Sequence, residues 1–138
     1  MARIMCIDYG KKRTGIAVTD TLQIISTGLM TIDTPELFIF LKKYFLEEEV
    51  ELLIVGEPLN LDDSDTHATP LVRQFIKRLG KEFPSIPVRT VDERYTSKRA
   101  KEAMFDMGMK KKDRRNKRNV DEIAATMMLQ EYMENKSR

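Results

Sequence analysis

Three acidic residues from distant parts of the chain have the types and positions that could hold a metal ion. They are Asp8, Glu93 and Asp121. Asp8 and Glu93 each follow an apolar, strand-like segment, where a carboxylate is partly desolvated and needs a cation or hydrogen-bond donors to stay ionised. Carboxylates that converge repel one another unless a proton or a divalent ion joins them, and Mg²⁺ prefers oxygen ligands. The three acids therefore predict a site for one or two Mg²⁺ or Mn²⁺ ions, suited to phosphodiester hydrolysis by a metal-activated water.

Each acid also has a simpler explanation. Asp8 could only accept hydrogen bonds from the turn that follows it. Asp121 is expected in the first turn of the last helix, where the helix dipole favours a carboxylate. Small residues one turn later, Ala124 and Ala125, would nevertheless let this helix approach the sheet and bring Asp121 to Asp8. Side chains alternate along a strand, so Asp92 and Glu93 should face opposite ways. Alternation alone does not say which of them faces the site; Glu93 is preferred, with Asp92 as the alternative.

Charge is unevenly distributed, although the net formal charge is only +2. Residues 33–65 hold ten acidic and two basic residues, whereas residues 88–118 hold twelve basic and five acidic ones. This asymmetry is typical of a protein with one face for polyanions. The run 110–118, with seven basic residues in nine, lies just before Asp121 and is expected to contact nucleic acid. The predicted nucleic-acid-binding residues are Lys12, Arg13, Asn60, Arg94, Lys98, Lys110, Lys111, Lys112, Arg114, Arg115, Lys117 and Arg118.

Hydrophobic periodicity predicts three antiparallel strands followed by helix, strand, helix, strand and two helices. The expected strands are 3–8, 15–19, 26–32, 51–56 and 88–93, the first of them apolar on both faces and thus central in the sheet. Helices are expected from Thr34, around 71–79, over 97–107, and from about 120 with Asn119 as N-cap and Glu122 at the capping-box position. The predicted fold is α/β, a mixed five-stranded sheet with helices on both faces and with Asp8, Gly56 and Glu93 near one edge.

Length and composition predict one domain over residues 1–138, with no signal peptide and no membrane-spanning segment, and so a cytoplasmic protein. The single cysteine, Cys6, lies in an apolar run and is expected to be a packed thiol rather than a redox group. The single histidine, His67, is expected at the surface rather than as a general base. Core packing is expected for the methionines of the last two helices, which are Met104, Met107, Met127, Met128 and Met133.

Four blocks of residues, in this order, resemble the bacterial YqgF or RuvX family over nearly the whole chain. They are Ile7-Asp8-Tyr9-Gly10 with Lys12, Arg13 and Gly15; Val55-Gly56 with Pro58-Leu59-Asn60; Asp92-Glu93-Arg94 with Thr96; and Val120-Asp121 with Ala124, Ala125, Leu129 and Gln130. The resemblance implies an RNase H-like fold, metal ligands at Asp8, Glu93 and Asp121, and trimming of the 5′ end of pre-16S ribosomal RNA. Tyr95, Glu57 and Asp63 depart from the family pattern, and Glu57 could either join the ions or hinder phosphate approach.

Other functions remain open at this point. Asp8, Gly10 and Gly15 also resemble the phosphate-binding turn of the actin and sugar-kinase ATPases, but those enclose nucleotide between two such domains. A non-catalytic nucleic-acid-binding module is a further alternative, which the grouped carboxylates disfavour. Processing of structured RNA, alone or on a pre-ribosomal particle, and resolution of Holliday junctions in DNA would use the same chemistry. The chain is expected to be a monomer or a weak homodimer; junction cleavage would favour the dimer.

Overall fold

The structure, a computed structural model, describes residues 2–58, 68–92, 102–103, 105–106, 108, 110 and 116–136. Its strands are β1 (Arg3–Asp8), β2 (Arg13–Thr19), β3 (Ser26–Asp33), β4 (Val50–Glu57) and β5 (Val88–Asp92). Its helices are the short 3₁₀ helix η1 (Thr34–Glu36), α1 (Leu37–Glu47), α2 (Thr69–Glu82) and α5 (Lys117–Lys136). These elements form the mixed sheet that the sequence predicts.

The sheet has five strands in the order β3-β2-β1-β4-β5. β1 pairs antiparallel with β2 and parallel with β4, β2 pairs antiparallel with β3, and β4 pairs parallel with β5. The central place of β1 follows from its sequence, because its residues from Ile4 to Ile7 are fully buried and apolar side chains cover both of its faces. The predicted three antiparallel strands followed by two parallel ones are confirmed.

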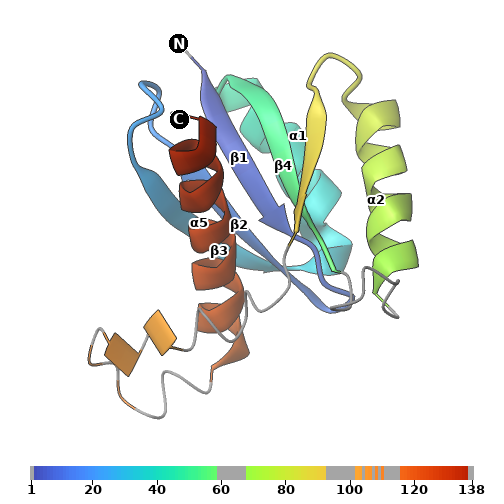
Figure 1. Cartoon of the computed structure of the whole chain (residues 1–138). Coiled ribbons are helices and arrows are strands. Elements are labelled where there is room, and N and C mark those ends of the chain that lie inside the picture. The colour runs from blue at the N-terminus through green and yellow to red at the C-terminus, as the bar shows by residue number, and fades with distance from the viewer. Residues whose placement is uncertain are drawn as a thin grey trace.

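Helices cover both faces of the sheet (Figure 1). α1 and α2 pack on one face, over a core that includes Met5 and Ile7 from β1. α5 crosses the other face over β1, β2 and β3, where Ile4 and Cys6 pack against Met128, Leu129 and other residues of the helix. Alternate residues of β1 thus serve two separate cores, as the strand period requires.

The last helix starts earlier than the sequence predicts. α5 begins at Lys117 rather than near Val120. The side-chain Oδ1 of Asn116 accepts a hydrogen bond from the backbone N–H of Arg118 at 3.0 Å, so Asn116 is the N-cap and the prediction of Asn119 is wrong. Both asparagines fit the N-cap preference, and the basic residues between them tolerate helix, so composition did not separate the two. Asp121 consequently lies in the second turn, not the first.

The other boundaries agree closely with the prediction. β2 begins at Arg13, two residues before the predicted start, which makes the turn after β1 shorter. Cys6 is fully buried, as predicted. Met128 and Met133 are in the core, whereas Met127 is only partly buried. No helix within the described part of the chain is both long and apolar enough to cross a membrane. His67 and most of the predicted helix 97–107 lie outside the described residues.

Candidate active site

Asp8 is the last residue of β1 and faces α5. Ile4 and Cys6 belong to the core beneath α5, and alternation along the strand puts Asp8 on the same face. Its side chain is half-buried, and its partner in the sheet register is Gly15 of β2. The carboxylate therefore stands at the end of a fully buried strand, at the edge of the sheet where the chain leaves it.

The backbone of α5 approaches the sheet closely at Gly15. A Cβ atom built on Gly15 would lie 2.1 Å from the carbonyl oxygen of Asp121 and 2.5 Å from its carbonyl carbon. No side chain fits at that distance, so the backbone of Asp121 rests directly on β2. Since Gly15 pairs with Asp8, this contact brings two of the three predicted carboxylate residues to neighbouring positions.

Further small residues extend the close approach along the helix. Ala125 is fully buried in the core between α5 and the sheet, whereas Ala124 packs with Val120 in a separate cluster. On β3, a Cβ atom on Gly28 would lie 2.7 Å from Oε1 of Glu122. The sequence prediction identified the alanines but missed Gly15 and Gly28, which it treated as turn or strand residues. The signal was there, since a glycine inside a strand often marks a close approach.

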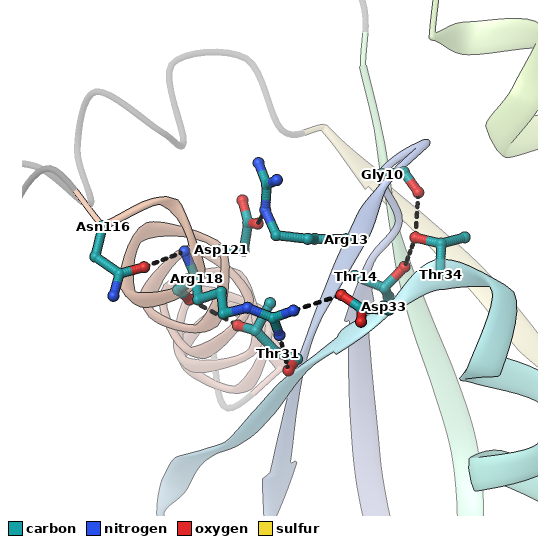
Figure 2. Close-up of polar contacts among 9 residues, drawn as sticks. All are labelled: Gly10, Arg13, Thr14, Thr31, Asp33, Thr34, Asn116, Arg118 and Asp121. Carbon is teal, nitrogen blue, oxygen red and sulfur yellow. Dashed lines mark hydrogen bonds and ion pairs between the residues drawn. The ribbon is translucent and has the colours of Figure 1, made fainter.

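Arg13 contacts Asp121 through an ion pair that the sequence did not indicate. Nε of Arg13 donates to Oδ2 of Asp121 at 3.3 Å, with the two side chains 28% and 26% exposed (Figure 2). Arg13 is the first residue of β2 rather than the tip of the turn, and it shares the α5 face with Gly15. In this structure the guanidinium of Arg13 is therefore paired with Asp121, one of the predicted metal ligands.

Two threonines fix the turn that separates Asp8 from Arg13. Oγ1 of Thr34 donates to the carbonyl oxygen of Gly10 at 2.6 Å and lies 2.9 Å from Oγ1 of Thr14, which is fully buried (Figure 2). The backbone N–H of Thr34 also donates to the carbonyl of Lys12 at 3.0 Å. Thr34 thus ties the turn to η1 instead of capping a helix. Its hydrogen bonds to Gly10 and Lys12 fix the turn that joins Asp8 to Arg13.

Two further acids lie near the same edge but on the other face of the sheet. Glu57 ends β4, and its Oε1 pairs with Nη2 of Arg73 on α2 at 3.2 Å. Asp92 ends β5 and is the register partner of Glu57. Val91 belongs to the core beneath α5, so alternation places Asp92 with Glu57, away from Asp8. Atoms of Asp92 nevertheless line, together with Val91, a hollow of about 260 Å³ beside α5, so Asp92 is also accessible from the α5 side at the end of β5.

The third predicted ligand, Glu93, lies outside the described residues. Within the described part of the chain, no group of three or more His, Cys, Asp or Glu side chains is arranged to hold a metal ion. The structure pairs Arg13 with Asp121 and places the Asp121 backbone over Gly15, the register partner of Asp8, while the complete trio of acids stays a prediction.

The predicted nucleic-acid-binding residues fall into three groups. Lys12 and Lys110 are exposed, and Lys117 opens α5. Arg13 and Arg118 are occupied by the protein. Arg13 pairs with Asp121, and the guanidinium of Arg118 donates to the carbonyl of Thr31 at 3.0 Å and pairs with Asp33 of β3, while Oγ1 of Thr31 donates back to the carbonyl of Arg118 at 2.6 Å (Figure 2). The others lie outside the described residues: Asn60, Arg94, Lys98, Lys111, Lys112, Arg114 and Arg115.

Solved structures resemble this fold across nearly its whole length. The Fowlpox virus resolvase in complex with Holliday junction DNA matches with a TM-score of 0.62 and 14% identity, covering 99% of both chains. RuvC of T. thermophilus in complex with a Holliday junction substrate matches with a TM-score of 0.59 and 15% identity, covering 99% of this chain and 96% of the other. At such identities the likeness concerns the fold, which is the RNase H-like α/β architecture predicted from the sequence.

Sequence relatives are much closer. A protein of Christiangramia forsetii is 51% identical over 133 residues, 96% of this chain and 98% of the relative. A protein of Phocaeicola vulgatus is 52% identical over 136 residues, 99% of this chain and 98% of the relative. Both carry the provisional name pre-16S rRNA nuclease. The sequence model of the RuvX family, described as Holliday junction resolvase, matches residues 2–135, and the chain therefore belongs to the RuvX family.

Proposed function

We propose that this protein is a metal-dependent nuclease whose active site is built around Asp8 and Asp121, in one domain over residues 1–138. The observation that carries the proposal is the contact of the Asp121 backbone with Gly15, the register partner of Asp8. Two carboxylates that converge at the end of a strand would repel one another, and a divalent cation between them would relieve that repulsion.

The donor set fits a hard cation. Asp8 on β1 and Asp121 on α5 carry carboxylate oxygens of the kind that Mg²⁺ and Mn²⁺ prefer, and α5 contacts the sheet at Gly15, the register partner of Asp8. The bound ion would supply an activated water and neutralise charge on the phosphodiester during in-line attack. Asp8 and Asp121 would hold that ion, and the turn fixed by Thr34 would keep Asp8 in place.

Glu93 is our candidate for the third ligand. The family resemblance implies Glu93, and the alternation of β5 disfavours Asp92, because Val91 packs beneath α5 and Asp92 is the next residue of the strand. The ion pair of Glu57 with Arg73 on the opposite face argues against Glu57 as a ligand. This assignment would complete the trio of acids that the family resemblance implies.

The favoured substrate is the 5′ region of pre-16S ribosomal RNA. Relatives about half identical to this chain over nearly their full length carry that assignment. The second candidate is a four-way DNA junction, because the family is described as Holliday junction resolvase. Exposed Lys12 and Lys110 and the basic run as a whole support a polyanionic substrate of either kind, because Lys and Arg bind phosphates without reading sequence.

A cleavage assay tests both the metal-dependent nuclease activity and the choice of substrate. Purified protein is incubated with a labelled pre-16S RNA fragment and with a labelled four-way DNA junction, in Mg²⁺, Mn²⁺ or EDTA. We expect cleavage with either metal, none in EDTA, and none with Asp8→Asn, while the matched control Glu57→Gln stays active. Preference for the RNA would support ribosomal RNA processing, and paired cuts in the junction would support resolution. Binding of both substrates without cleavage would contradict the nuclease.

A further inference from the structure

We infer that Arg13 is a resident cation of the metal site: it neutralises Asp121 before a metal ion binds, and the metal must compete with it. The inference rests on the proposed function in one respect, namely that Asp121 is a metal ligand. It reassigns Arg13, which the sequence suggested as a phosphate-binding residue, to the positioning of a carboxylate.

The ion pair is placed by the backbone rather than by chance approach of two long side chains. Arg13 pairs with Asp33 in the register of β2 and β3, so the backbone of Arg13 is held in the sheet by β3. Asp121 is fixed by the contact of its own backbone with Gly15, two residues along β2. Both side chains are about three-quarters buried, since they are 28% and 26% exposed, which reduces the screening of their attraction by water.

Within the described residues, Asp121 is the side-chain partner of Arg13, and the contact uses Nε. Figure 2 shows the rest of the guanidinium directed away from Asp121. Arg13 therefore meets the carboxylate with one nitrogen, at 3.3 Å, rather than through the two-pronged contact that gives the strongest Arg–carboxylate pairs. Such a contact holds the carboxylate in place yet can be displaced by a divalent ion.

A divalent ion on Asp121 would stand close to the guanidinium, and like charges in a partly desolvated site repel. Removing Arg13 should therefore strengthen metal binding, by roughly three- to tenfold for a pair of this exposure. The same change should destabilise the metal-free protein, because Asp8 and Asp121 would lose a neutralising charge. Tighter metal binding together with lower metal-free stability distinguishes a resident cation from a residue that merely supports the fold.

The first test measures Mn²⁺ binding to the full chain by calorimetry for wild type, Arg13→Ala and Lys12→Ala. Lys12 is the matched control, because it is adjacent, exposed and carries the same charge. We expect Arg13→Ala to bind Mn²⁺ about three- to tenfold more tightly than wild type and Lys12→Ala to stay within about twofold. Equal or weaker binding by Arg13→Ala would overturn this inference alone, whereas no binding by wild type and Arg13→Ala would contradict the proposed function and this inference with it.

A second test needs no metal. Unfolding in urea with EDTA is measured for wild type, Arg13→Ala, Asp121→Asn and the double variant, a cycle that isolates the coupling of the two side chains. We expect the coupling to change the unfolding equilibrium constant by roughly fivefold in favour of the wild-type pair. Additive effects of the two single substitutions would overturn the inference whatever the metal measurements give.

Discussion

Gly15 lies directly beneath the backbone of Asp121, so closely that a Cβ atom on Gly15 would be 2.1 Å from the Asp121 carbonyl oxygen. A strand residue and a helix residue more than a hundred positions apart in the chain are thereby held in contact. Because Asp8 is the register partner of Gly15, this contact places the backbones of Asp8 and Asp121 near the same point of the sheet.

Substitution of Gly15 by alanine should displace α5 and disrupt the site. The added methyl group cannot be accommodated against backbone atoms, and overpacking of this kind costs about 1–3 kcal/mol of unfolding free energy. We expect a loss at the upper end of that range, together with loss of cleavage, measured by urea unfolding and by the nuclease assay.

Gly80 provides the control for that substitution. It lies within α2, and a Cβ atom built on it meets nothing within 4 Å. Gly80→Ala should therefore leave activity unchanged and stabilise the protein by about 0.5–1 kcal/mol, the helix preference of alanine over glycine. If Gly15→Ala behaved like Gly80→Ala, α5 would not be seated on β2 as described.

Arg118 should affect stability more than nucleic-acid binding, although it belongs to the basic run. The guanidinium of Arg118 pairs with the carboxylate of Asp33 and donates to the carbonyl of Thr31. The side chains of Arg118 and Asp33 are each about half exposed. Arg118→Ala should lower the unfolding free energy by about 1 kcal/mol, since it removes an exposed ion pair and a hydrogen bond.

Lys110, exposed at the other end of the same run, should behave in the opposite way. Lys110→Ala should leave stability unchanged, weaken binding of RNA and DNA alike, and reduce the slope of log affinity against log salt by about 1. Binding measured by fluorescence anisotropy over a salt series checks both variants. Loss of binding in Arg118→Ala at unchanged stability would show that Arg118 contacts phosphate instead.

The loop between β2 and β3 should weaken in acid. Hydrogen bonds from backbone N–H groups, first that of Ile25 and then those of Ile24 and Leu22, hold the pKa of Asp20 below its ordinary value. A lowered pKa in the folded state means that the stabilisation is complete above the unfolded pKa, about 4, and is lost as pH falls through the folded value.

We therefore expect Asp20→Ala to be less stable than wild type at pH 7, with a difference that shrinks as pH falls below about 4. Urea unfolding of both proteins from pH 7 to pH 3 measures it. A difference that stayed constant over this range would show that the carboxylate charge does not support the loop.

Much of the fold follows from the sequence because its signals are local. β1 is apolar on both faces, which predicts its central place in the sheet. Alternation of apolar residues predicts that β2 is a strand, and helical spacing predicts that α1 and α2 are helices. The start of α5 was misplaced because Asn116 and Asn119 carry the same N-cap signal, and only the seating of the helix on β3 through Arg118 separates them.

The candidate site was predictable in its acids but not in how they meet. Asp8 could be predicted as a site residue because it places a carboxylate at the end of an otherwise apolar strand. The contacts of Gly15 with Asp121 and of Arg13 with Asp121 join β2 to α5, and contacts between elements far apart in sequence leave no periodic pattern in one chain. The face of Glu57 became clear only through its pair with Arg73.

The central claim is that Asp8 and Asp121 belong to one divalent-cation site, and the most direct test is Mn²⁺ binding by calorimetry to wild type, Asp8→Asn, Asp121→Asn and Glu57→Gln. Each of the first two substitutions removes a ligand, so each should weaken binding at least about tenfold, whereas Glu57→Gln, at the same edge but on the other face, should bind as wild type does. Mn²⁺ binding that survives unchanged in either Asp8→Asn or Asp121→Asn would contradict a shared site.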